Sequence, residues 1–285
     1  MPEPTEPEPA EPEPTEPVSA APAPRTARTV APAPRRSGRH AVVIAHRGAS
    51  AHHPENTLSA FMAAWDGGAQ WVEADTQPTA DGVPVLLHDA DLDRTTSGSG
   101  PVRGLDVDAV TAVDAGAWFP GSDPVSTRTG VRVPRLSELL ARLTPARKVL
   151  LEIKGEHTAE QIDAVVRACR ASGRDGNVFL QSFETTALQL RRVEPRRSMG
   201  LLVEGVDDDP VGRCRELGAV ACNPGYKAVL DRPEIVGRLH AAGLSVSVWT
   251  ADDPADWAAL TRAGVDGIIT NTPAELLRWQ ASADR

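Results

Sequence analysis

The chain has 285 residues, a length that fits one α/β barrel or two smaller domains. Hydrophobic residues make up 41% of it, which is enough for a sizeable core. The formal net charge of −9 argues against a protein that binds nucleic acid through a broad basic face.

The first 39 residues form a low-complexity segment that is rich in proline, acidic at its start and basic toward its end. Proline removes backbone hydrogen-bond donors, and the segment has little apolar surface to bury. We therefore predict a disordered tail over residues 1–39. The alternative is a tether or a docking arm, for which the sequence indicates no particular partner.

The cysteines and the hydropathy of the chain bear on its compartment. The three cysteines fit no CxxC metal site, and we expect buried thiols in a reducing compartment. No run approaches the ~20 apolar residues of a transmembrane helix, and the N-terminus lacks the apolar stretch of a signal peptide. These features predict a cytoplasmic protein without stable membrane association.

From residue 41 onward, short β-branched runs alternate with amphipathic stretches. In the first amphipathic stretch, Leu58, Phe61, Met62 and Trp65 have helical spacing, and Asn56 is the expected N-cap. Another helix is predicted through residues 162–169. Strands are predicted at residues 41–45, 71–75, 83–88, 148–153, 178–181, 199–203, 219–222, 244–249 and 267–270.

The link between the second and third strand candidates is too short for a parallel crossover and contains the hairpin dipeptide Asp81-Gly82. We therefore expect residues 83–88 to fold back as an antiparallel arm. Eight strands remain, each followed by a helix, and this alternation is typical of a parallel sheet. The predicted fold is a TIM (β/α)8 barrel over residues 40–282, with a small inserted subdomain over about residues 90–134 near the barrel mouth.

Three carboxylates stand at the carboxyl ends of predicted strands, where barrels of this kind place their active sites. Glu73 and Asp75 share one strand face because they are two residues apart, and Glu152 ends the next parallel strand. A divalent cation such as Mg²⁺ or Ca²⁺ would relieve their mutual repulsion. The alternative is that the carboxylates form salt bridges with Arg47 and Lys154.

Two histidines, His46 and His88, also end predicted strands. Imidazole titrates near neutral pH, so the pair can supply a general base and a general acid. Arg47 and Lys154 supply fixed positive charge that can hold a phosphate group. The chemistry that these groups favour is displacement at phosphorus. The sequence leaves open which histidine acts as the acid.

With these residues, the chain resembles the glycerophosphodiester phosphodiesterase family. The matching segments are HRGAS, PENTLSAF, WVEADTQPTADGVPVLLHDADLDRTTSGSG, LEIK, QSF, SVWT and VDGIITNTP, in that order between residues 41 and 277. The resemblance implies a TIM barrel that binds one calcium or magnesium ion and hydrolyses glycerophosphodiesters to glycerol 3-phosphate and an alcohol.

The resemblance also implies roles for individual residues. By position, His46 and His88 take the catalytic roles, while Arg47 and Lys154 face the phosphate. The metal ligands by position are Glu73, Asp75 and Glu152. Family members are thought to let a glycerol hydroxyl attack phosphorus, giving a cyclic phosphate that water then opens.

Three further residues are assigned to substrate binding with alternatives left open. Glu55 stands beside the metal or orients Arg47, or it merely begins a helix. Phe183 and Trp249 line the alcohol side of the pocket, or they belong to ordinary barrel packing. Four other histidines are expected at the surface: His52, His53, His157 and His240.

Two rival functions remain compatible with the sequence. A lysophospholipase D-like enzyme would keep the chemistry and need an apolar surface in the insertion, for which Trp118 and Phe119 are the only indication. A catalytically silent barrel that binds phosphodiesters would keep the pocket without turnover. Both readings, like the first, call for a small-molecule phosphodiester as the partner.

Overall fold

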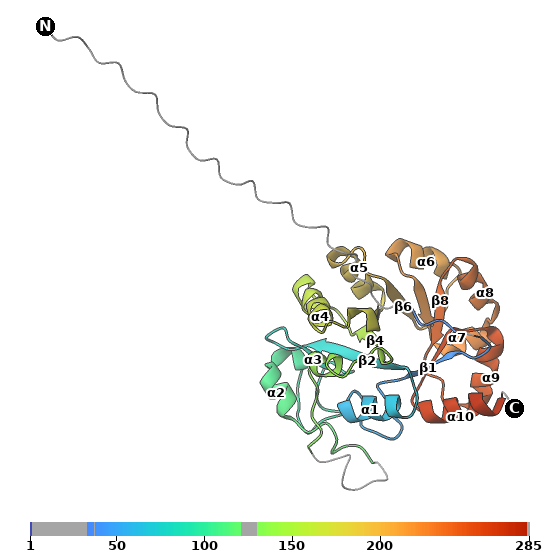
Figure 1. The fold of residues 1–285 in the computed structure, drawn as a ribbon, viewed down its shortest axis with the longest axis horizontal. Helices are drawn as coiled ribbons and strands as arrows, with labels where there is room; N and C mark the ends of the chain where they lie inside the picture. The colour runs from blue at the N-terminus through green and yellow to red at the C-terminus, as the bar shows by residue number, and fades with distance from the viewer. Residues whose placement is uncertain (2–32, 37, 121–129, 284–285) are drawn as a thin grey trace.

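The computed structural model describes residues 1, 33–36, 38–120 and 130–283 (Figure 1). In this part of the chain, nine strands form one sheet. They are β1 (Val42–Ala45), β2 (Trp71–Pro78), β3 (Pro84–Leu86), β4 (Lys148–Ile153), β5 (Val178–Ser182), β6 (Met199–Val203), β7 (Ala221–Pro224), β8 (Ser245–Val248) and β9 (Gly267–Thr270).

The parallel strands close into a barrel because β1 pairs with both β2 and β9. The other parallel strands follow in chain order from β2 through β4 to β9. The short strand β3 pairs antiparallel with β2, with Thr76 opposite Leu86. The predicted TIM barrel and its antiparallel arm are therefore confirmed, although β2 runs three residues further than expected and β7 begins and ends two residues later.

Helices surround the strands in Figure 1. They are α1 (Leu58–Asp66), α2 (Val107–Ala112), α3 (Leu136–Leu140), α4 (Ala159–Ala171), α5 (Glu184–Val193), α6 (Pro210–Leu217), α7 (Tyr226–Asp231), α8 (Glu234–Ala241), α9 (Pro254–Ala263) and α10 (Pro273–Ala283). Apolar side chains on the outer face of the strands, such as Val72 and Leu151, form one buried core with the helices. None of the described helices is long and apolar enough to cross a membrane.

The start of α1 differs from the sequence prediction. Thr57, rather than Asn56, is the N-cap, and its hydroxyl accepts a hydrogen bond from the backbone N–H of Ala60. Asn56 has a φ of 56°, in the left-handed region. The predicted cap was wrong because the Asn56 side chain is held by Asp75 in the barrel instead.

The segment between β3 and α3 carries α2 and a short 3₁₀ turn, Val102–Gly104. Its apolar side chains, among them Leu92, Val102 and Val110, gather with Val85 into a separate small core. This arrangement suits the predicted insertion over residues 90–134, of which residues 121–129 lie outside the described residues.

The barrel interior is layered because alternate strand residues face inward. Near the amino ends of the strands the interior is apolar, with Ile44, Trp71, Leu150 and Phe179 in one cluster. Two residues further along the same strands, the inward positions become polar: Glu73, Glu152 and Gln181. The strand sequences therefore place an apolar layer near the amino ends of the strands and polar or ionisable side chains near their carboxyl ends.

The amino-terminal end of the barrel is covered by residues that we expected to be disordered. Ala33 is 7% exposed and packs in the cluster of Ile44 and Trp71. Arg35 donates a hydrogen bond to the Gly243 carbonyl, just before β8. The predicted tail over residues 1–39 thus extends too far, because residues 33–36 have a buried surface to bind. Residues 2–32 and 37 lie outside the described residues.

Candidate active site

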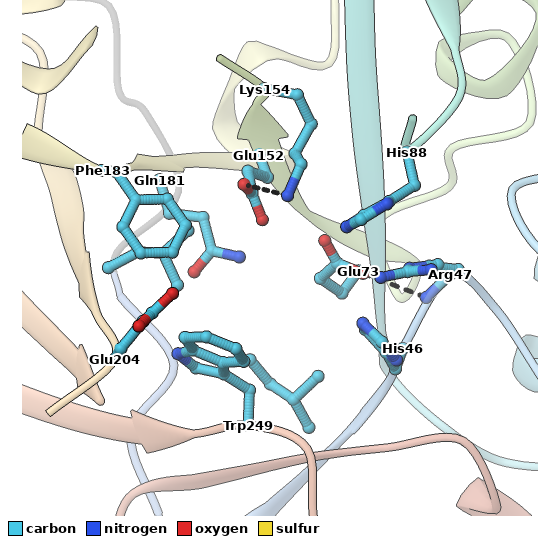
Figure 2. Close-up of a pocket in the computed structure, with 12 residues that line it drawn as sticks. His46, Arg47, Glu73, His88, Glu152, Lys154, Gln181, Phe183, Glu204 and Trp249 are labelled. Atoms are coloured by element: carbon cyan, nitrogen blue, oxygen red, sulfur yellow. Dashed lines mark hydrogen bonds and ion pairs between the residues drawn. The ribbon is translucent and has the colours of Figure 1, made fainter. Parts of the chain in front are cut away.

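A cavity of about 260 Å³ opens at the carboxyl ends of the strands (Figure 2). It is lined by His46, Arg47, Glu73, His88, Glu152, Lys154, Gln181, Phe183, Leu202, Glu204, Trp249 and Ile269. In Figure 2, the two histidines and Arg47 lie on one side, while Phe183, Glu204 and Trp249 lie on the other. Eight of the ten residues predicted for the site line this cavity, and the exceptions are Asp75 and Glu55.

Three buried carboxylates, Glu73, Asp75 and Glu152, each offer an oxygen within 4.8 Å of the others. Burial, Asp75 and Glu152 together raise the pKa of Glu73 well above its usual value. Burial and Asp75 likewise raise the pKa of Glu152 to about 7. Asn56 anchors Asp75, since its amide donates to Oδ2 at 2.8 Å and accepts from the backbone N–H at 3.0 Å.

The nearby cations offset this negative charge only in part. The backbone N–H of Arg47 donates to Glu73 at 3.0 Å, and its guanidinium Nε lies 3.2 Å from Asp75 Oδ2. The Lys154 ammonium lies 2.9 Å from Glu152 Oε1. The salt bridges considered as the alternative to a metal are therefore present. However, the raised pKa values of Glu73 and Glu152 show that these cations do not balance the burial of the cluster.

The donor set fits a hard divalent cation. Carboxylate oxygens are the ligands that Mg²⁺ and Ca²⁺ prefer, and three of them converge here from two neighbouring strands. A divalent charge would favour the ionised form of each carboxylate and so offset the repulsion that, together with burial, raises the pKa values of Glu73 and Glu152.

The backbone at the end of β1 aims the Arg47 side chain and N–H. Arg47 has a φ of 54° and Gly48 a φ of 84°. A Cβ at Gly48 would lie 2.5 Å from the carbonyl carbon of Ala60, so only glycine lets this turn pass so close to α1. Burial opposes the charge of Arg47, yet Asp75 and Glu55 raise its pKa above the ordinary value.

His46 is held by a chain of hydrogen bonds from the neighbouring strand ends. Its Nδ1 lies 2.7 Å from Asn271 Oδ1, while Asn271 Nδ2 donates to Asp252 at 2.6 Å. Because an amide oxygen can only accept, this orientation of Asn271 puts the imidazole proton on Nδ1 and leaves Nε2 as an acceptor. Burial, and secondarily Arg47, lower the pKa of His46 to about 4, so the ring is neutral at neutral pH.

His88 has a different partner. Its Nδ1 lies 2.6 Å from Asp89 Oδ1, so a carboxylate faces the ring instead of an amide. The Arg94 guanidinium binds the same carboxylate with two hydrogen bonds and, with Asp89's bond to His88, lowers the pKa of Asp89 to about 2. The two histidines are thus held in chemically distinct settings.

Glu55 does not line the cavity, and its Oε1 accepts a hydrogen bond from Arg47 Nη1 at 2.8 Å. This contact agrees with the hypothesis that Glu55 orients Arg47. Opposite the histidines, Phe183 and Trp249 pack edge to face, with ring centroids 6.1 Å apart. Between them in Figure 2 stands Glu204, whose carboxylate makes no hydrogen bond or ion pair with another described residue.

Sequence reasoning missed several residues of the site: Asn56, Arg94, Gln181, Glu204, Asp252 and Asn271. Most of them stand in or beside segments that match the family, so the match pointed to their neighbourhood without assigning them roles. The surface prediction for His157 was wrong, since it is 8% exposed. His240 is half-buried and lies 2.8 Å from Asp266 Oδ2.

The fold and the cavity define a (β/α)8-barrel protein with a buried carboxylate cluster at the carboxyl ends of its strands. The sequence model of the "Glycerophosphoryl diester phosphodiesterase family" matches residues 46–275. The chain belongs to this family.

Individual relatives agree with the family match. A glycerophosphodiester phosphodiesterase of Caldanaerobacter subterraneus is 31% identical over 240 residues, which cover 83% of this chain and 96% of the relative. A putative glycerophosphoryl diester phosphodiesterase of Silicibacter pomeroyi has a solved structure with a TM-score of 0.79 and 29% identity, covering 88% of this chain and 96% of the other. A phosphodiesterase of Oleispira antarctica, solved with the product sn-glycerol-3-phosphate, has a TM-score of 0.77 and 27% identity, covering 85% and 96%.

Proposed function

We propose that this chain hydrolyses glycerophosphodiesters to sn-glycerol 3-phosphate and an alcohol, with a divalent cation as its cofactor. The observation that carries the proposal is the meeting of three buried carboxylates, two histidines and two cations in and around one cavity. The product bound in the Oleispira antarctica relative supports the same substrate class.

The residues that would hold the cation, Mg²⁺ or Ca²⁺, are Glu73, Asp75 and Glu152. When bound, a divalent ion supplies positive charge that stabilises the negative charge developing on the phosphoryl oxygens. Arg47 and Lys154 flank the same carboxylates, and their donors add to the binding of the phosphate group. Their electrostatic attraction to the phosphate strengthens as the substrate displaces water from the cavity, because the local dielectric constant falls.

The two histidines divide the proton transfers between them. His46 is neutral, with Nε2 free to accept, so it takes the proton from the hydroxyl oxygen that attacks phosphorus. His88 Nδ1 is held by Asp89 Oδ1 at 2.6 Å, which orients the ring, and we assign to His88 the transfer of a proton to the leaving alkoxide. The bond from phosphorus to the leaving oxygen breaks as the new phosphorus–oxygen bond forms, which gives a cyclic phosphate and the free alcohol. Water then opens the ring: His88, now unprotonated, takes the proton of the water, and His46 returns its proton to the glycerol oxygen, which gives glycerol 3-phosphate and restores both histidines.

The wall opposite the histidines binds the glycerol. Phe183 and Trp249 supply apolar surface for its carbon atoms, and Glu204 accepts hydrogen bonds from its hydroxyl groups. An acylated hydroxyl has no proton to donate to the Glu204 carboxylate, so a lysophospholipid would lose this hydrogen bond. This chemistry favours glycerophosphodiesters over lysophospholipids.

The two aromatic residues of the insertion that suggested a surface for lysophospholipids pack against each other instead of lining the cavity. Trp118 and Phe119 pack edge to face at 5.6 Å, Phe119 is buried, and the Trp118 indole donates to the Ala115 carbonyl. Neither lines the cavity. For the location of the enzyme, the cytoplasm remains our proposal, which the three buried free thiols support.

The test is an assay of glycerol 3-phosphate release from glycerophosphocholine by EDTA-treated protein titrated with Mg²⁺ and Ca²⁺. Turnover should return with one of these ions. His46→Ala and His88→Ala should each lower kcat by about 10²–10⁴-fold without loss of the fold. The control is His52→Ala at an exposed position that does not line the cavity.

Two results would contradict the proposal. Absence of turnover with every divalent ion tried would leave a phosphodiester-binding barrel. Activity on a lysophosphatidylcholine but not on glycerophosphocholine would favour the lysophospholipase D-like alternative.

A further inference from the structure

Arg94 lies outside the cavity, in the inserted segment, yet it contacts the partners of two cavity residues. Its guanidinium binds both oxygens of Asp89, with Nε 2.5 Å from Oδ2 and Nη2 3.1 Å from Oδ1. It also binds both oxygens of Glu55, with Nη1 3.0 Å from Oε2 and Nη2 2.8 Å from Oε1. One arginine therefore clamps two carboxylates from separate loops.

Each clamped carboxylate holds a residue of the active site. Asp89 Oδ1 lies 2.6 Å from His88 Nδ1, and Glu55 Oε1 lies 2.8 Å from Arg47 Nη1. Arg47 in turn reaches Asp75 in the carboxylate cluster at 3.2 Å. A continuous series of polar contacts thus runs from the carboxylate cluster through Arg94 to the second histidine.

The geometry favours a guanidinium at this position. A planar guanidinium offers several N–H donors in a fixed fork, so it can bind two carboxylates at once and hold their relative positions. A lysine ammonium is a single point charge on a flexible stem and fixes neither distance nor angle. Without Arg94, Glu55 and Asp89 would also repel each other across the gap that it fills.

We propose that Arg94 is a positioning residue that joins the Arg47–Glu55 pair and the His88–Asp89 pair into one unit. The inserted segment then contributes to turnover as well as to the packing beside the barrel. This inference rests on the proposed function, because its effect is read from phosphodiester hydrolysis.

The structure also predicts that Arg94 matters little for stability. Its side chain is 44% exposed, and exposed ion pairs stabilise folds weakly. A catalytic constellation is more sensitive, since a displacement of about 1 Å costs on the order of 10²-fold in rate. Loss of activity with an unchanged fold is therefore the signature of the proposed role.

The experiment compares Arg94→Gln and Arg94→Lys with wild type, measuring kcat, KM and Tm. We expect Arg94→Gln to lower kcat by about 10–100-fold with little change in Tm, and Arg94→Lys to recover only part of the loss. The matched control is Arg135→Gln, because Arg135 is 40% exposed and also binds a carboxylate of the inserted segment, Asp108. This control should keep wild-type kcat.

A double-mutant cycle with Glu55→Gln separates positioning from a general structural effect. If Arg94 acts through Glu55, the two substitutions together should cost less than the product of the single losses. Wild-type kcat in Arg94→Gln, or multiplicative losses in the cycle, would overturn the inference while leaving the proposed function intact. An inactive wild type would instead overturn the proposed function.

Discussion

At the scale of single residues, the pKa of Glu152 is set by its burial and by neighbouring charges that act in opposite directions. The residue is 7% exposed and its carboxylate lies near Glu73 and Asp75, and both facts favour the protonated form. Lys154 at 2.9 Å favours the ionised form. The effects of burial and Asp75 are larger than that of Lys154, so the pKa of Glu152 rises to about 7. The Lys154 ammonium alone therefore does not balance the negative charge of this cluster, which could hold a cation.

This balance predicts how the stability of the metal-free protein depends on pH. A carboxyl whose pKa is higher in the folded chain stabilises the fold below its unfolded pKa of 4.5, and this contribution is lost as the pH rises through about 7. In EDTA, Tm of wild type should therefore fall between these pH values relative to Glu152→Gln, which does not titrate. The expected change is about 3 kcal/mol in the free energy of unfolding.

The same series in excess Mg²⁺ or Ca²⁺ provides the control. Ion binding requires ionised carboxylates, so wild type should gain stability from the ion as the pH rises, and Glu152→Gln should gain less. A difference in Tm between the two proteins that stays constant with pH in EDTA would show that Glu152 does not titrate in this range.

At the scale of elements, the ends of three neighbouring strands cooperate to hold one histidine. His46 follows β1, Asn271 follows β9, and Asp252 follows β8. Asp252 accepts from the Asn271 backbone N–H at 2.8 Å and from its side-chain amide at 2.6 Å. The amide oxygen of Asn271 is thereby turned toward His46. The proton on the imidazole is thus set by a carboxylate two strands away.

Asp252→Ala should therefore impair His46 without touching it. With Asp252 gone, the Asn271 amide can rotate and present Nδ2 to His46 Nδ1, which favours the opposite tautomer of the ring. We expect kcat to fall about 10-fold or more with KM nearly unchanged, and ¹⁵N spectra of His46 should show the change of tautomer. Asp256→Ala, in the first turn of α9, is the control. An unchanged tautomer would refute the role of Asp252.

The strands and their terminal residues could be predicted because both follow a regular period. Glu73 and Asp75 share a face by alternation, and parallel strands bring Glu152 to the same edge. The supporting contacts could not be predicted, since they depend on loop backbones. Asn56 looked like a helix cap, but its left-handed φ of 56° turns it toward Asp75 instead. Arg94 acts at a sequence distance of 39 residues from Glu55, for which no periodic pattern exists.

At the scale of the whole molecule, the barrel needs closure at the end opposite the active site. The apolar layer of Ile44, Trp71 and Phe179 would otherwise face solvent there. Ala33 packs against this layer, and the segment that carries it is held by Arg35 at Gly243 and by the Arg36 backbone N–H at Asp266. Residues 33–36 therefore complete the apolar core at the end of the barrel opposite the cavity.

The closure makes a buried charge at residue 33 costly. Ala33→Asp would place a carboxylate against the apolar layer, at a cost of about 2 kcal/mol, or roughly 4–8 °C in Tm. The control is Ala146→Asp in an exposed turn, which should melt like wild type. A chain lacking residues 2–36 should likewise melt below one lacking residues 2–32. Because the site lies at the other end of the strands, kcat of Ala33→Asp well below its Tm should stay near wild type. Equal melting of the two aspartate variants would mean that the segment does not seal the barrel.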